Sequence, residues 1–203
     1  MISKNAALPM KWEDALFVID ALKTDSPKDL ESRLFIATGI YTGFRLNEMR
    51  LLTFNDLLDK EYIETEKTKG SRYRKVKINK PLQECFNDFL ACYSHLHYWK
   101  PSMYLFSKFS GNLRHRNSPL RKESLLARFK AIMKRFNINL HKCSTHAMRK
   151  AFGKRVYEKA LDRFPQHKAL NITQAALGHS SSETTIRYIG IEFEVIDEIY
   201  DII

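Results

Sequence analysis

A candidate phosphate-binding arginine, Arg45, lies in the segment TGFRLNEMRLL, residues 42–52. It follows Gly43 at a point where the sequence pattern predicts the start of a helix. A helix N-terminus with a guanidinium beside it is a good phosphate site, because backbone N–H groups and forked donors converge there. Glu48, three residues later, is placed to orient Arg45 or to cap the helix. Taken alone, the segment also fits an ordinary surface arginine near a helix start.

A second candidate group, His146 with Arg149, lies in the segment STHAMRKAF, residues 144–152. Thr145 is the expected N-cap of a helix, and residues three apart share one face of that helix. Such a pair could hold one phosphate and transfer a proton beside it. A structural histidine with a surface arginine is the alternative, because HxxR is a short pattern that occurs by chance.

A third candidate group lies in LGHSSSETTIRY, residues 177–188. His179 follows Gly178, a glycine that ends a short helix, in a turn where backbone donors and a ring nitrogen can face a ligand. Thr184 and Thr185 are expected to begin the helix that carries Tyr188. A tyrosine hydroxyl can serve as a nucleophile, although packing against a core is the simpler interpretation of one tyrosine alone.

Taken together, these segments resemble the tyrosine recombinase family of phage integrases, Xer-type resolvases and DNA invertases. That family has an arginine in TG-x-R-x-x-E, a lysine on a β-hairpin, HxxR, LGH, and a tyrosine about nine residues later. The resemblance extends from about Trp12 to Ile189. It implies that the catalytic residues, apart from the lysine, are Arg45 with Glu48 in support, His146, Arg149, His179 and Tyr188.

The lysine position is open among the basic residues of the expected hairpin. Lys67 precedes a threonine and therefore matches the family's K-T pattern best, with Lys69 as the alternative. The resemblance implies that this lysine acts as general acid for the departing 5′-oxygen. Lys75 and Lys77 are then solvated charges or phosphate contacts.

The resemblance also implies a reaction at a DNA phosphodiester. Tyr188 would attack phosphorus to form a 3′-phosphotyrosyl link and a free 5′-hydroxyl, and the 5′-hydroxyl of another strand would then resolve that link. Forked donors from Arg45 and Arg149 suit the non-bridging oxygens. His146 is the expected proton acceptor, and His179 is the expected donor to a phosphate oxygen. Because the arginines neutralise charge, neither a metal nor another cofactor is expected.

The charge distribution favours nucleic acid as the partner, and the resemblance implies that this partner is double-stranded DNA. The net charge is +11 and the isoelectric point is about 9.6. Residues 108–155 hold 14 Lys/Arg against one acid, whereas residues 183–203 hold six acids against one arginine. A concentrated basic field of this size suits a polyanion. The expected DNA contacts are Lys69, Arg72, Arg74, Arg128 and Lys150, and the helices over residues 123–136 and from residue 146 are the candidates for groove contact.

Hydrophobic spacing predicts one mainly helical domain with a small antiparallel sheet, as in a tyrosine recombinase catalytic domain. Trp12, Leu16, Ile19 and Leu22 predict a first helix that ends before Pro27. An apolar helix over residues 29–52 is expected to break near residue 43. Short β-prone runs on either side of residues 69–71 predict a hairpin. Further helices are expected over residues 81–96, 122–136, 145–161, 171–178 and 192–203.

The sequence contains no apolar run of 18 residues and no signal-peptide pattern, so no membrane span is expected. Cys85, Cys92 and Cys143 have neither metal-ligand nor disulfide-framework spacing. They indicate a reduced, cytoplasmic compartment. The resemblance implies the nucleoid of a prokaryote or its mobile element as the location.

The expected domain covers residues 1–203, with residues 12–190 as catalytic core and residues 191–203 as a C-terminal tail. Because the pattern begins by Trp12, the N-terminal clamping domain of many family members is expected to be absent. The resemblance implies that the tail docks onto a neighbouring subunit in a tetrameric complex on DNA, with docking onto its own domain as the alternative. The apolar residues and acids of the tail fit such docking. Two other functions stay open: a type IB topoisomerase-like relaxing enzyme, and a non-catalytic DNA-binding regulator on the same fold.

Overall fold

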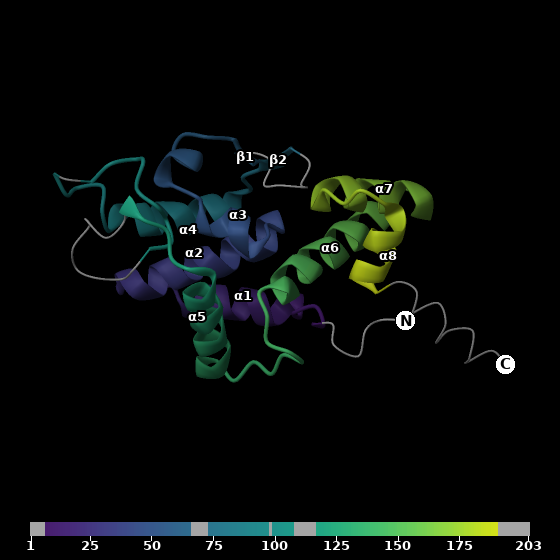
Figure 1. Cartoon of the computed structure of the whole chain (residues 1–203), viewed down its shortest axis with the longest axis horizontal. Helices are drawn as coiled ribbons and strands as arrows, with labels where there is room; N and C mark the ends of the chain where they lie inside the picture. The colour runs from purple at the N-terminus through teal and green to yellow at the C-terminus, as the bar shows by residue number, and fades with distance from the viewer. Residues whose placement is uncertain (1–6, 66–72, 98, 108–116, 191–203) are drawn as a thin grey trace.

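Helices and one two-stranded sheet make up the part of the chain that the structure describes. The computed structural model describes residues 7–65, 73–97, 99–107 and 117–190. In chain order (Figure 1) the elements are α1 (Trp12–Ala21), α2 (Pro27–Thr42), α3 (Leu46–Arg50), the 3-10 helix η1 (Phe54–Asp56), β1 (Tyr62–Thr65), β2 (Arg74–Lys77), α4 (Lys80–Ala91), α5 (Lys122–Arg135), α6 (His146–Leu161), α7 (Gln166–Leu177) and α8 (Ser182–Ile189). The mainly helical fold class with a small antiparallel sheet is confirmed. Within the described ranges, none of the helices has both the length and the apolar character needed to cross a bilayer.

The expected break after α2 is confirmed and depends on one glycine. Gly43 ends α2 with a φ of +62°, in the left-handed region. A Cβ atom at this position would lie 2.3 Å from Cδ1 of Phe152. Both the backbone conformation and the close approach of α6 therefore require glycine. The turn redirects the chain so that α3 begins directly after Arg45.

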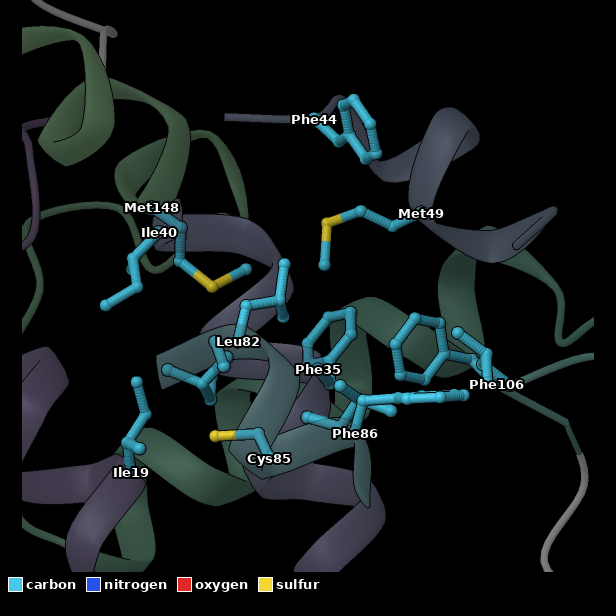
Figure 2. Packing of buried hydrophobic residues seen from close by; sticks show 14 of the residues in the cluster. Ile19, Phe35, Ile40, Phe44, Met49, Leu82, Cys85, Phe86, Phe106 and Met148 are labelled. Carbon is cyan, nitrogen blue, oxygen red and sulfur yellow. The ribbon is translucent and has the colours of Figure 1, made fainter. Parts of the chain in front are cut away.

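The larger hydrophobic core surrounds α2, which is buried on most of its circumference. Figure 2 shows large apolar side chains from several elements packed together here, including Phe35 and Phe106, whose ring centroids are 5.4 Å apart. Burying a side chain of this size contributes about 1.5–3 kcal/mol. Phe44 and Met49 are also buried in this core, each with 1% of its surface exposed. Because they lie on either side of Arg45 in the sequence, they fix the start of α3.

A second, smaller core joins the C-terminal helices. It contains Tyr157, Ala160, Ala169, Leu177 and Ile189, contributed by α6, α7 and α8. In Figure 1, α7 and α8 lie beyond one end of α6, away from α4 and α5. The helices α7 and α8 make most of their contacts with α6 and with each other. The described residues are thus organised around two cores, and α6 connects them.

The expected hairpin is confirmed as an antiparallel pair of β1 and β2. Its register places Tyr62 opposite Lys77 and Thr65 opposite Arg74. The connecting residues 66–72, which include the candidate positions Lys67, Lys69 and Arg72, lie outside the described residues, as does the tail helix expected over residues 192–203.

Some helix boundaries differ from the expectations. Leu16 was expected on the buried stripe of α1 but is 40% exposed, because α1 packs through neighbouring residues that include the small Ala15. Thr145 precedes α6 without forming a side-chain cap. The helix α8 begins at Ser182 rather than at Thr184, and it is capped by Ser181, whose Oγ accepts a hydrogen bond from Thr184 N at 3.2 Å. The helix α7 begins at Gln166, five residues before the expected start.

Candidate active site

Arg45 and Glu48 form the first part of the site, at the start of α3. The Arg45 backbone N–H donates to Glu48 Oε2 at 2.6 Å, and Arg45 Nη1 lies 3.4 Å from Glu48 Oε1. Glu48 therefore caps the helix and orients the guanidinium at the same time. The Glu48 side chain is 3% exposed, whereas that of Arg45 is 36% exposed. Arg45 thus keeps a face toward solvent from which it can reach a ligand.

Arg149 projects from the first turn of α6 into the protein and is 2% exposed. Its two terminal nitrogens donate to the backbone carbonyls of Gly43 and Leu177. Burial lowers the pKa of Arg149 to about 10, with the charges of Arg45 and Arg74 acting in the same direction. The guanidinium remains charged at neutral pH. A surface position, which the short HxxR pattern alone would also allow, is wrong for this arginine.

His146 is the first residue of α6 and is exposed to solvent. Partial desolvation lowers its pKa below the ordinary value, and the positive charges of Arg149, Arg45 and Lys150 lower it further. The imidazole is therefore neutral at pH 7 and has a lone pair that can accept a proton.

His179 lies in the turn between α7 and α8 and is 7% exposed. Its Nδ1 is 3.1 Å from Thr185 Oγ1, and the Thr185 hydroxyl donates to the carbonyl of Ser181 at 3.2 Å. Because the single hydroxyl hydrogen is directed to Ser181, the hydroxyl oxygen accepts from an Nδ1–H group, which leaves the Nε2 lone pair of a neutral ring unprotonated. Burial lowers the pKa of His179 to about 4, and nearby arginines contribute to the decrease. The ring is neutral at pH 7.

Tyr188 lies on α8, with its ring against the residues just described. Its ring centroid is 5.0 Å from that of His179 at an interplanar angle of 78°, and Arg149 Cζ is 5.9 Å from the Tyr188 centroid. The hydroxyl is buried and makes no hydrogen bond of regular geometry to any described residue, although a weak hydrogen bond with Arg149 acts to lower its pKa. Burial raises the pKa of Tyr188 to about 12, against the opposing charges of Arg149 and Arg45. An unpaired polar atom in a buried position is rare and is often functional.

Lys150 follows Arg149 on α6 and faces the same ring. Its Nζ lies 5.3 Å from the centroid of the Tyr188 ring. Desolvation lowers the pKa of Lys150. This residue, expected from the sequence to contact DNA, is therefore also part of the electrostatic surroundings of Tyr188.

Two of the arginines expected to contact DNA have buried carboxylate partners in the structure. The Arg74 side chain is 4% exposed and pairs with Glu48, and it also donates to the carbonyl of Ala176. The Arg128 side chain is 19% exposed and pairs with Glu31, which is 1% exposed. Both guanidiniums are directed into the protein by buried carboxylates, so neither is presented on the surface as a phosphate contact.

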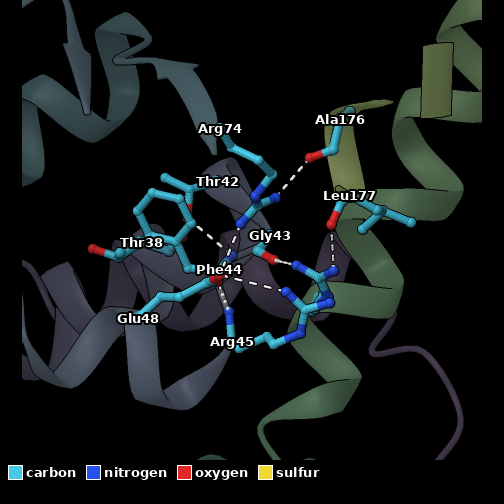
Figure 3. Close-up of polar contacts among 10 residues, drawn as sticks. Thr38, Thr42, Gly43, Phe44, Arg45, Glu48, Arg74, Ala176 and Leu177 are labelled. Carbon is cyan, nitrogen blue, oxygen red and sulfur yellow. Dashed lines mark hydrogen bonds and ion pairs between the residues drawn. The ribbon is translucent and has the colours of Figure 1, made fainter. Parts of the chain in front are cut away.

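The polar contacts in Figure 3 bring together elements that are distant in sequence. Arg45, Arg74 and Arg149 supply three positive charges, and Glu48 supplies one negative charge nearby. The excess of positive charge around the buried Tyr188 hydroxyl favours an anionic ligand. A cleft of about 410 Å³ lies beside this group, lined in part by His179 and Gln174. The described residues contain no group of three His, Cys, Asp or Glu side chains arranged to hold a metal ion.

The structure brings together five of the catalytic residues expected from the sequence, namely Arg45, His146, Arg149, His179 and Tyr188, while Lys67 and its alternative Lys69 lie outside the described residues. Sequence reasoning missed two contributors. Thr185 was expected only to help start a helix, and its Oγ1 instead lies 3.1 Å from His179 Nδ1. Arg74 was expected on the surface, and the pairing of its hairpin position with Glu48 has no local sequence signal.

Comparisons with known proteins agree with this geometry. Residues 10–194 match the family model described as the phage integrase family. The chain is 26% identical over 164 residues to the probable integrase/recombinase YoeC of Bacillus subtilis (81% of this chain and 80% of that protein). It is 24% identical over 190 residues to the tyrosine recombinase XerD of Corynebacterium glutamicum, covering 92% of this chain and 58% of that protein.

Solved structures share the fold. A post-cleavage complex of the XerH site-specific recombinase with palindromic difH substrate superposes with a TM-score of 0.70 at 25% identity, covering 96% of this chain and 53% of that chain. XerA recombinase gives 0.69 at 20% identity, covering 98% and 65%. The lambda integrase catalytic core gives 0.54 at 18% identity, covering 85% and 91%. The chain thus spans between half and two thirds of XerH, XerA and the Corynebacterium relative. Since the family model spans nearly all of the sequence, the chain belongs to the phage integrase family of tyrosine recombinases, as its motifs indicated.

Proposed function

We propose that the protein is a site-specific DNA recombinase that cleaves and rejoins DNA through a covalent 3′-phosphotyrosyl intermediate. The observation that carries this proposal is the buried hydroxyl of Tyr188, which has no hydrogen bond of regular geometry and lies in a group of arginines with an excess of positive charge. A phosphodiester would supply both the missing hydrogen-bond partner and the negative charge. A protein that only binds DNA has no need of a nucleophile in this position.

In the proposed reaction, the Tyr188 oxygen forms a bond to phosphorus while the bond from phosphorus to the 5′-oxygen breaks. The tyrosine proton passes to neutral His146, and the 5′-oxygen takes a proton from Lys67, or from Lys69 as the alternative. Arg45 and Arg149 bind the non-bridging oxygens, whose negative charge increases in the transition state. Removing one such preorganised donor raises the activation free energy by about 3–4 kcal/mol. The bond energy stays in the phosphotyrosyl link, so rejoining needs no nucleotide cofactor.

The pKa values support a proton transfer concerted with attack. With its pKa raised to about 12, Tyr188 is almost entirely protonated at pH 7, so the proton must leave as the oxygen attacks. His179 is neutral without DNA, since its pKa is lowered to about 4. A bound phosphate would raise that pKa, because an adjacent negative charge favours the imidazolium. Nε2 would then carry a hydrogen for a phosphate oxygen, while Nδ1–H keeps its bond to Thr185.

A suicide-substrate assay tests the proposal. A library of labelled duplexes with randomised arms, nicked so that the short cleaved fragment diffuses away, is incubated with the protein and stopped with SDS. We expect a stable protein–DNA adduct whose released fragment carries a 5′-hydroxyl that polynucleotide kinase labels directly. Tyr188→Phe should form no adduct. If the wild type forms none with any duplex that it binds, or the variant forms as much, the proposed function is wrong.

The same assay separates recombination from topoisomerase activity. Adding a second duplex with a complementary 5′-hydroxyl end should convert the adduct into a recombinant strand. The comparisons support recombination, since XerH and both curated relatives are named as recombinases. Relaxation of any supercoiled plasmid without strand transfer would favour the type IB alternative.

We also propose that the protein assembles on double-stranded DNA as a tetramer through its tail, residues 191–203, and that it acts on DNA in the nucleoid. The tail is rich in acids and in apolar residues, whereas residues 108–155 are strongly basic, so the two are complementary between subunits. Deleting residues 192–203 should abolish higher-order complexes with DNA in native gels, while circular dichroism still reports a folded protein. Undiminished higher-order complexes would contradict tail docking and favour attachment of the tail to its own domain.

A further inference from the structure

Arg74, the first residue of β2, connects three parts of the site. Its Nη2 donates to Glu48 Oε2 at 3.1 Å, and its Nη1 donates to the carbonyl of Ala176 at 2.7 Å. Figure 3 shows the guanidinium between these two partners, which come from opposite sides of the site. Its Cζ also lies 5.2 Å from the centroid of the Phe44 ring. One side chain thus contacts α3, α7 and the residue that precedes Arg45.

Each partner of Arg74 leads directly to a residue of the proposed mechanism. Glu48 Oε2, which accepts from Arg74, also accepts from the backbone N–H of Arg45. Ala176 is the penultimate residue of α7, three positions before His179. A Cβ atom on Gly178 would lie 2.7 Å from Arg74 Cδ, so the turn that carries His179 packs against the Arg74 stem. A shift of Arg74 would therefore move Arg45 and His179 relative to each other.

The contact is important because it crosses between the two cores. Glu48 and Arg74 belong to the part of the molecule built on the larger core, whereas α7 and α8 pack in the smaller one. The carbonyls of Ala176 and Leu177, at the end of α7, are bound by Arg74 and Arg149 respectively. These two arginines join the end of α7 to the α2–α3 region by hydrogen bonds, which are directional and therefore fix the position of the α7 end.

Arginine is the side chain that this position requires. A guanidinium is planar and presents separate donors, so it can bind a carboxylate and a carbonyl in two directions at once. A lysine would keep the positive charge but would act as a compact point charge on a flexible stem. A methionine would fill a similar volume and would leave both the buried Glu48 carboxylate and the Ala176 carbonyl with one partner fewer.

We propose that Arg74 is a positioning residue for DNA cleavage, which holds the His179 turn and Arg45 in register across the boundary between the two cores. The proposal rests on the proposed strand-cleavage function. It assigns Arg74 no contact with DNA, in contrast to the expectation from the sequence. Removing Arg74 should therefore reduce the rate of the chemical step and leave DNA affinity largely unchanged.

The experiment compares Arg74→Met and Arg74→Lys with Arg33→Met as a matched control. Arg33 is also a buried arginine with one carboxylate and one backbone partner: it pairs with Asp88 and donates to the carbonyl of Ile19 at 3.1 Å. Single-turnover cleavage is measured at saturating suicide DNA. Affinity is measured separately by gel shift, with each variant combined with Tyr188→Phe. Amide hydrogen exchange at the end of α7 is recorded without DNA, and thermal melting reports folding.

We expect Arg74→Met to cleave about 100-fold more slowly than wild type, which is the order of loss for an ångström-scale misplacement. Its affinity should stay within about threefold of wild type, as should both the affinity and the rate of Arg33→Met. The amides at the end of α7 should exchange faster in Arg74→Met but not in Arg33→Met. Arg74→Lys should melt close to wild type yet cleave about tenfold more slowly, since one ammonium cannot hold both partners.

Several results would overturn the proposal. A positioning role is refuted if Arg74→Met cleaves DNA as fast as Arg33→Met. It is also refuted if weaker DNA binding explains the loss of cleavage rate, or if amide exchange at the end of α7 is unchanged. Should Arg74→Met not fold, Arg74→Lys carries the test, and a wild-type rate in that variant refutes the need for a fork. If wild type itself forms no adduct, the proposed function fails instead, and the exchange comparison still tests the Arg74 contact.

Discussion

Replacing Thr185 by valine should slow DNA cleavage without weakening DNA binding. Thr185 is fully buried, and its hydroxyl accepts from His179 Nδ1 at 3.1 Å while donating to the Ser181 carbonyl at 3.2 Å. Valine keeps the shape of the side chain and removes both bonds. The Nδ1–H group of a nearly buried ring then has lost its acceptor, and the imidazolium that would donate to phosphate is disfavoured.

The size of the effect follows from the bond that is lost. A hydrogen bond to a charged group contributes about 1.5–3 kcal/mol, and about 1.4 kcal/mol corresponds to a tenfold change in rate. If the His179 imidazolium stabilises the transition state, Thr185→Val should cleave about 10- to 100-fold more slowly at saturating DNA. Thr185→Ser retains the hydroxyl and both of its bonds, so it is the matched control and should stay near the wild-type rate.

The assay is single-turnover cleavage of a suicide duplex, with affinity measured by gel shift in the Tyr188→Phe background. Melting curves for Thr185→Val and Thr185→Ser show whether the two variants fold equally well. Equal cleavage rates for these variants would refute the reasoning, because they would show that the proton on His179 Nδ1 does not matter. A rate loss that disappears at saturating DNA would assign Thr185 to binding rather than to the chemical step.

Three further predictions concern the pH dependence of stability, the substitution of glycines and the effect of removing metal ions. The pKa of His179 in the folded state is lowered from 6.5 to about 4, so the unfolded chain binds the proton first as pH decreases. The free energy of unfolding should therefore fall by about 1.4 kcal/mol per pH unit as pH decreases from 6.5 to about 4. Urea titrations of His179→Gln should show a weaker dependence of this free energy on pH, and an unchanged dependence would contradict the assignment. Gly43→Ala should lower the free energy of unfolding by more than the roughly 1–2 kcal/mol cost of an alanine in the left-handed conformation, because its Cβ would also clash with Phe152. Gly190 has a φ of +84° and no atom within 4 Å of an added Cβ, so Gly190→Ala should lose only that conformational cost in the same melting assay. Adduct formation should persist in excess EDTA, because arginines supply the charge neutralisation; an activity lost to EDTA and restored by Mg²⁺ would show otherwise.

The sequence predicted the elements and the short motifs because both depend on neighbouring residues. The break at Gly43, the helix from His146 and the turn at Gly178 all have local signals, and the structure has each of them. The start of α7 had no such signal. Its first turn, from Gln166, is polar and exposed, and it shows no apolar spacing to mark a helix.

Side-chain partners could not be predicted in the same way. Arg74 binds the carbonyl of Ala176, 102 residues later, and Arg128 pairs with Glu31, 97 residues earlier. A basic residue in a basic segment has the same local pattern whether a buried carboxylate or a phosphate lies opposite it. Only the packing of distant elements distinguishes a surface charge from a buried ion pair, and this is why both arginines were expected on the DNA-binding surface.

In the proposed mechanism, the charge balance of the site would direct DNA binding toward catalysis. Arg149 is buried with two neutral carbonyls as its hydrogen-bond partners, while Glu48 is shared between Arg45 and Arg74. Burying a guanidinium without a full counter-charge is costly, as the lowered pKa of Arg149 indicates. The free energy gained from the larger core and from the contacts across the two cores offsets this desolvation cost when the protein folds. In the proposed reaction, a phosphate that enters the site would gain an interaction that becomes stronger as its oxygens gain charge, so part of the folding free energy would lower the activation barrier.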